Sequence, residues 1–88
     1  MSKEATFRSE LERDGFAPVE VSWEPNLVND WHTHEFTARV MVLKGSVKIA
    51  REGSEIEYGP GDACEMGANV SHAEYVGPEG VSLLVGRK

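Results

Sequence analysis

The sequence has little of what marks disulfide-stapled or membrane-spanning chains. One cysteine, Cys64, stands among 88 residues, so neither an internal disulfide nor a zinc site built from cysteine pairs can form. No apolar run approaches the ~20 residues that cross a bilayer. No basic-then-apolar leader opens the chain either. We therefore expect a cytoplasmic protein with no membrane partner.

Basic residues are scarce as well. The chain has nine Lys and Arg residues but fifteen Asp and Glu residues. Its formal net charge is −6, and it contains no basic cluster. This balance disfavours nucleic acid and other polyanions as partners. The hydrophobic content of 40% is ordinary for a globular protein. A chain of this length predicts one domain, residues 1–88, with a small core that a metal or a partner subunit would help to stabilise.

Only the first residues predict a helix. The stretch 3–13 lacks Gly and Pro, and Phe7 and Leu11 stand four apart on one helical face. Ser2 is a candidate N-cap, and Gly15 is a candidate stop signal. We expect residues 1–16 to form a short helical extension that packs on the rest of the chain.

Residues 17–88 have the pattern of an all-β structure. Segments 19–23 and 47–50 alternate apolar and polar residues, and 31–43 is a long extended stretch. Turn signals recur at short intervals, most clearly at 44–46, 52–54, 59–62 and 77–80. The further strand candidates are 56–58, 63–66, 70–76 and 81–85. Seven or eight short strands at this spacing predict a sandwich or barrel.

Two of the three histidines lie in the stretch NDWHTHEFTAR, at His32 and His34. On one regular strand the two side chains point to the same face, and Phe36, Ala38 and Val40 lie on that face too. Because these three residues are apolar, we expect the face to point towards the interior. Neutral imidazole suits transition metals, and two ligands from one strand would need a third from elsewhere. The spacing alone leaves open a plainer interpretation, two polar surface residues near a strand end.

A second stretch, from Gly61 to His72, completes a family resemblance. His32, His34 and a closing glycine, Gly45, match the first sequence motif of the cupins, and Gly61 and His72 match the second. The chain thus resembles a cupin, a small jelly-roll barrel of two packed antiparallel sheets. The resemblance covers roughly residues 26–76. It implies a cupin-type double-stranded β-helix over residues 17–88.

One departure from the motifs bears on the metal. Ala38 stands where cupins usually carry a glutamate, so the resemblance implies a divalent transition metal (Fe, Zn, Ni or Mn) held by His32, His34 and His72 alone. The site could instead recruit another carboxylate or have lost metal. A three-histidine site would leave coordination positions open for water or substrate. The other departures are Asn26, Gly67, Asn69 and Val76.

Glu74 shares a strand face with His72 if the strand is regular. It could be a catalytic general base, a fourth metal ligand or a partner that orients an imidazole, or else a rim carboxylate in water. The pocket-lining residues that we expect are Phe36, Ala38, Cys64 and Met66. The Cys64 thiol could instead be a buried, inert group.

Arg39 and Arg51 are candidates for binding a substrate carboxylate, because a guanidinium can donate two parallel hydrogen bonds to the two carboxylate oxygens. The plainer interpretation of both is a solvated surface charge.

Two function classes remain open. One is a metal-dependent enzyme, a dioxygenase-like oxidoreductase or an isomerase, that acts on a small organic substrate. The other is a non-catalytic cupin that binds or senses a small ligand, since a fold does not dictate a function. A structural protein that metal merely stabilises is a third, weaker possibility. The resemblance also implies a homodimer.

Overall fold

The computed structural model describes residues 2–88. Helix α1 (Lys3–Arg13) has the predicted bounds. The Ser2 hydroxyl accepts a hydrogen bond from Ala5 N at 3.1 Å, which satisfies one of the free N–H groups of the first turn. Asp14 caps the C-terminal end of the helix, and Gly15 then takes a positive φ of 84°. No helix within residues 2–88 is long and apolar enough to cross a bilayer.

The rest of the chain forms one antiparallel six-stranded sheet, so the all-β prediction is confirmed. The strands are β1 (Ala17–Trp23), β2 (Val28–His32), β3 (Ala38–Arg51), β4 (Ser54–Tyr58), β5 (Ala63–Met66) and β6 (His72–Arg87). The prediction of seven or eight separate strands was wrong. The turn signals at 44–46 and 77–80 lie inside β3 and β6, which bend there instead of ending.

Glycines explain the bend. The pairing of β3 with β6 shifts register between Val42 and Lys44 and again between Gly45 and Val47. Gly45 has φ +79°, and a Cβ built there would lie 2.0 Å from the Gly80 carbonyl oxygen. Only a residue without a side chain allows the two main chains to approach this closely.

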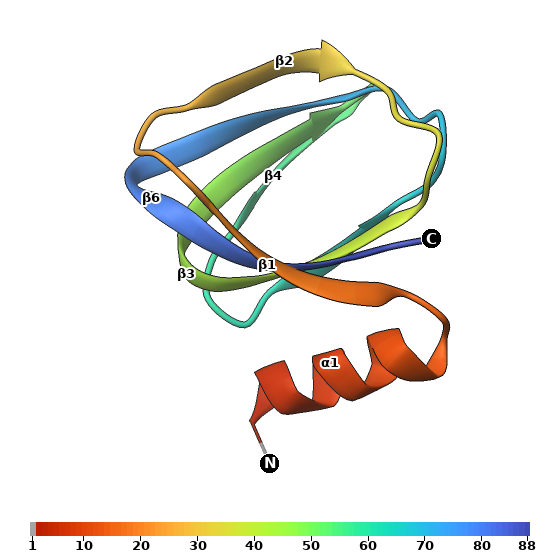
Figure 1. Ribbon diagram of the computed structural model, residues 1–88. Coiled ribbons are helices and arrows are strands. Elements are labelled where there is room, and N and C mark those ends of the chain that lie inside the picture. The colour runs from red at the N-terminus through yellow and green to blue at the C-terminus, as the bar shows by residue number, and fades with distance from the viewer. Residues whose placement is uncertain (1) are drawn as a thin grey trace.

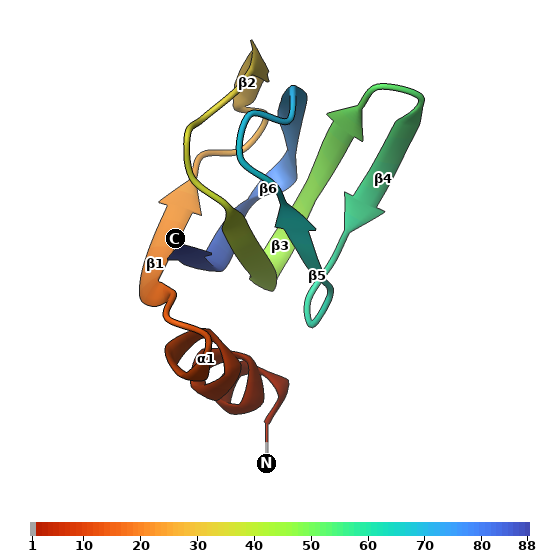
Figure 2. The same cartoon turned by 90° about the vertical axis from the view of Figure 1, so that its right-hand side faces the viewer.

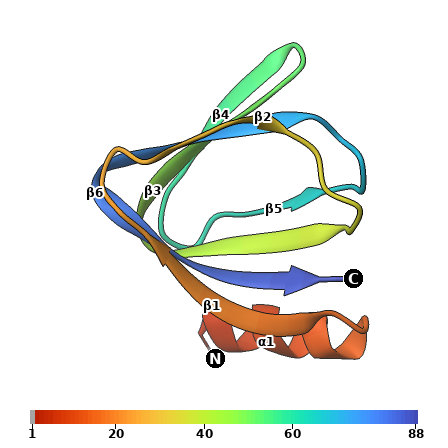
Figure 3. The same cartoon turned by 45° about the horizontal axis from the view of Figure 1, so that its top comes forward.

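The bend divides the sheet into two facing layers (Figure 3). In the first layer, β1 pairs with the second half of β6, which pairs with the first half of β3 and so connects to β5. In the second layer, β2 pairs with the first half of β6, which pairs with the second half of β3 and so connects to β4. Figure 2 shows β4 and β5 flanking β3 on one side. The strand path does not close on itself, so the jelly roll stays open at one end.

Apolar side chains fill two separate spaces. The main core lies between the layers and consists of Ala38, Val40, Val42, Val47, Ile49, Met66, Val76, Val81, Leu83 and Val85. A smaller cluster of Leu11, Phe16 and Leu84 lies outside the first layer. There α1 packs against the sheet (Figure 1) through Leu11, the helix residue with no exposed surface. The apolar stripe of the helix thus covers the outer face of one layer.

The predicted strand over residues 31–43 is interrupted. β2 ends at His32 and β3 begins at Ala38, so His34 and Phe36 belong to a loop. The loop has its own main-chain partners. The His34 carbonyl accepts from Asn69 N at 2.8 Å, and Thr37 and Lys88 exchange two hydrogen bonds of 2.9 and 3.0 Å. These bonds hold the loop at the open end of the jelly roll, where strand alternation no longer sets side-chain direction.

Candidate metal centre

The structure brings the three histidines together from three segments. His32 ends β2 and pairs in register with His72, the first residue of β6, while His34 comes from the loop. The ring centres of His72 lie 4.4 Å from His32 and 4.9 Å from His34. One ring nitrogen from each residue lies within 4.8 Å of the other two. The three residues are therefore close enough that they could hold a metal ion.

Main-chain carbonyls set the protonation of all three rings. His32 Nδ1 lies 2.6 Å from Asp30 O, His34 Nδ1 2.9 Å from Phe36 O, and His72 Nδ1 2.9 Å from Val70 O. A carbonyl oxygen only accepts, so each Nδ1 carries the hydrogen and donates it. In the neutral ring the lone pair is then on Nε2, the arrangement that metal-ligating histidines adopt.

His72 Nε2 has no partner of its own. The residue is fully buried, and within residues 2–88 no hydrogen-bonding group reaches this nitrogen. A buried polar atom left unsatisfied costs about 1–3 kcal/mol. A metal ion shared by the three Nε2 atoms would satisfy this nitrogen, so the residues present fit such an ion.

Glu74 lies beside the histidines and is largely buried, with 7% of its surface exposed. Its Oε1 accepts from Asn29 Nδ2 at 3.2 Å and lies 3.7 Å from His32 Nε2. The interpretation as a rim carboxylate in water therefore does not hold. The compact donor group consists of the three histidines without Glu74, which leaves the carboxylate next to the group.

A cavity of about 520 Å³ opens in front of the histidines, between the two layers. This volume is in the range of small-molecule sites. Of the predicted lining residues, Phe36, Ala38 and Met66 border it. Ala38 is buried on the cavity side of β3. The position where cupins usually carry the glutamate thus faces the cavity with only a methyl group.

Cys64 does not border the cavity, contrary to the prediction from its parity with Met66. It packs against the main core together with Tyr58 of β4. Burial raises the pKa of the Cys64 thiol and also that of the Tyr58 hydroxyl. The structure thus favours the alternative of an inert thiol, although Cys64 is only half-buried.

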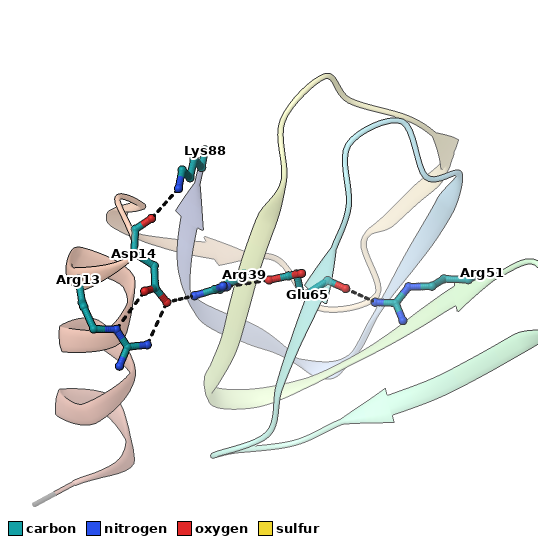
Figure 4. Close-up of polar contacts among 6 residues, drawn as sticks. All are labelled: Arg13, Asp14, Arg39, Arg51, Glu65 and Lys88. Atoms are coloured by element: carbon teal, nitrogen blue, oxygen red, sulfur yellow. Dashed lines mark hydrogen bonds and ion pairs between the residues drawn. The ribbon is translucent and has the colours of Figure 1, made fainter.

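Neither Arg39 nor Arg51 borders the cavity. Arg39 donates to Asp14 and, at 2.7 Å, to Glu65, and it lies over the Phe16 ring at 4.4 Å. Arg51 donates to the Glu65 carbonyl oxygen at 3.1 Å (Figure 4). Both guanidinium groups are already paired within the protein, so their positions do not support the alternative in which they bind substrate.

Three polar residues of the cavity were missed from the sequence: Asn29, Asp30 and Arg87. Asn29 and Asp30 belong to β2, which was not predicted as a strand of its own. Arg87 carried a usable signal. It continues the alternation of Leu83 and Val85, and the predicted last strand simply ended two residues too early.

Comparison with known proteins agrees with this fold. The family model described as Cupin domain matches residues 19–85. The chain therefore belongs to the cupin family. No curated protein sequence matches it.

Solved structures of the same fold include a protein of unknown function from Rhizobium leguminosarum bv. viciae 3841, with 17% identity and a TM-score of 0.77 over 82% of this chain and 68% of that one. The polyketide cyclase RemF from Streptomyces resistomycificus has 29% identity and a TM-score of 0.67, over 82% and 54%. The DMSP lyase DddQ from Ruegeria pomeroyi DSS-3 has 23% identity and a TM-score of 0.71, over 83% and 38%. The chain thus spans about half of the cyclase and less than half of the lyase.

Proposed function

We propose that this cupin is a metal-dependent enzyme that acts on a small organic substrate. The observation that carries the proposal is the fully buried His72 Nε2, which lacks a partner and faces two other imidazoles with the same tautomer. His32, His34 and His72 would hold one divalent transition metal, Fe, Zn, Ni or Mn. Such an ion supplies Lewis-acid chemistry or, if it is iron, redox chemistry with dioxygen.

The chain's own residues contribute binding and proton transfer. The apolar walls of the cavity exclude water and orient the carbon skeleton of the substrate. Glu74 is placed to take a proton from that substrate. Asn29 donates to one carboxylate oxygen, Oε1, and no group within residues 2–88 donates to the other. One oxygen thus positions the group and the other is free to act as a base.

A buried carboxylate beside the histidines favours proton-transfer chemistry, as in an isomerase, over dioxygenase-like oxidation. The structural relatives named as a cyclase and a lyase agree with this preference only by analogy, since a shared fold supports many activities. The second candidate is a cupin that binds or senses a small ligand without turnover. The apolar lining from Trp23, Val40, Leu83 and Val85 favours that candidate.

Metal content tests the proposal first. Protein refolded in turn with Fe, Mn, Ni or Zn should retain about one ion per chain by elemental analysis. His34→Ala and His72→Ala should lose that ion. Glu57→Gln, a change at an exposed carboxylate on β4, serves as the matched control and should keep it. Wild-type protein that retains no stoichiometric metal would overturn the proposed function.

A further inference from the structure

Arg87 stands at the mouth of the cavity. It is the last residue of β6 and follows Leu83 and Val85 on the inner face of the first layer. Its register partner on β3 is Ala38, which borders the cavity too. Side chains on paired residues of neighbouring strands point to the same face. The Arg87 side chain accordingly forms part of the cavity lining.

The Arg87 guanidinium is uncommitted. Within residues 2–88, no acceptor lies within hydrogen-bond or ion-pair distance of it. Each of the other arginines has a polar partner: Arg8, Arg13, Arg39 and Arg51. The Arg87 backbone, in contrast, is fixed. It pairs with both β1 and β3, and the next residue exchanges two hydrogen bonds with Thr37. The paired strands therefore hold the positive charge of Arg87 at the mouth of the cavity. The N–H donors of its guanidinium have no acceptor within residues 2–88.

Ring stacking links this charge to the histidines. Arg87 Cζ lies 5.4 Å from the centre of the Phe36 ring, and that ring stacks on His34 at 4.1 Å. The sum of the two distances, 9.5 Å, is the largest possible separation of Cζ from the His34 ring centre. A molecule only a few carbon atoms long can therefore touch both ends of the cavity.

We propose that Arg87 anchors the substrate by a carboxylate group, and that the substrate is a small, mainly apolar monocarboxylate whose reacting end lies at the histidines. This assignment rests on the proposed function, because it takes the histidine group as the reacting end. A guanidinium offers two parallel N–H donors that match the two oxygens of a carboxylate. The apolar walls suit the carbon chain between the two ends.

The charges around the cavity favour one negative charge over several. Asp30 and Glu74 also border the cavity, and Arg87 is the one Lys or Arg residue among its lining within residues 2–88. Together with a divalent ion at the histidines, Arg87 exceeds these two carboxylates by one positive charge, so a phosphate or a dicarboxylate would leave an excess of negative charge. A monocarboxylate needs only the one guanidinium.

The test uses paired probes on zinc-loaded protein. A hydroxamate binds the metal at one end and carries, after two to five methylene groups, either a carboxylate or a neutral carboxamide. Calorimetry should show wild-type protein preferring the carboxylate about tenfold at the best chain length, the effect of a charge-assisted hydrogen bond. Arg87→Gln should abolish the preference while leaving metal content and carboxamide affinity unchanged. Arg87→Lys should retain part of it, and Arg8→Gln, the matched control, all of it.

Two results would overturn the assignment: a wild-type protein that binds both probes equally, or an Arg87→Gln protein that keeps the preference. Failure of the proposed function looks different. Elemental analysis would then find no zinc before any probe is added, and neither probe would bind through its hydroxamate.

Discussion

At the residue scale, the histidine tautomers connect the sequence to the chemistry of the site. Each Nδ1 is occupied by a carbonyl two residues away in the chain, so each Nε2 keeps the lone pair that a metal could accept. A local main-chain contact thereby fixes a property that the three residue types alone do not. Without it, an imidazole could present either nitrogen to a metal.

Glu74→Gln separates two roles of the carboxylate. Glutamine retains the oxygen that accepts from Asn29 but is a far weaker proton acceptor. We expect metal affinity to stay within about threefold of wild type, while turnover of a substrate, once identified, falls by roughly 10²–10⁴. Metal titration against a chromophoric chelator measures the first quantity, with Glu57→Gln as the control. A drop in affinity of more than about tenfold would show that Glu74 is a metal ligand instead.

Motif spacing predicted the three histidines as a group, although His34 lies in a loop and not on a strand. Strand parity suggested that Glu74 shares a face with His72, but it left open whether the carboxylate belongs to the site. The sequence could not predict the hydrogen bond from Asn29 to Glu74, because that contact depends on the pairing of β2 with β6. Cys64 shows the limit of parity. It shares a strand with Met66, yet Tyr58 from a neighbouring strand packs beside it, and only tertiary structure reveals that neighbour.

At the scale of elements, two bent strands and one docked helix shape the molecule. Turn signals correctly located the bends at 44–46 and 77–80 but were interpreted as strand ends. Composition shows where the chain changes direction. It does not show that β3 and β6 keep pairing on both sides of the change, because that pairing is a long-range contact.

Substitution of Gly45 tests the bend. Gly45→Ala places a Cβ against the Gly80 carbonyl at a positive φ, so we expect a loss of about 3 kcal/mol or more in unfolding free energy. Gly53→Ala is the matched control. Gly53 has a similar φ of +76° but nothing within 4 Å of a Cβ, and should lose only about 1 kcal/mol. Equal losses in urea unfolding would contradict a close approach of the two strands.

Ion pairs at Asp14 attach the end of α1 to the sheet (Figure 4). Hydrogen bonds from Arg13 and then Arg39 hold the pKa of Asp14 well below its ordinary value of 3.8. The charged form is therefore favoured in the folded state. Its contribution to stability is present above the unfolded pKa and is lost as the pH falls through the lower folded value.

Asp14→Asn should reveal this pH dependence. The wild-type advantage in unfolding free energy should be full at pH 6 and should shrink once the pH drops below about 4. Urea unfolding at several pH values measures it. Glu12→Gln, at an exposed carboxylate with no ion pair within residues 2–88, is the control. An advantage that stays constant down to pH 2 would contradict the ion-pair account.

At the scale of the whole molecule, the two layers meet at the bend and open at the other end, where β2, the loop 33–37 and both ends of β6 place the polar groups of the cavity. The family resemblance predicted this architecture, and it named the three histidines that the structure brings together. Arg87, at the end of the last strand, was not predicted, although it borders the same cavity as the histidines.

The central claim is that three Nε2 atoms converge on one metal ion. X-ray absorption spectroscopy of zinc-loaded protein tests this most directly, because it identifies the donor atoms around the metal. The account predicts three imidazole nitrogens at about 2.0–2.1 Å, with oxygen completing the shell and no sulfur. Fewer than three imidazoles, or a sulfur donor from Cys64 at about 2.3 Å, would contradict it.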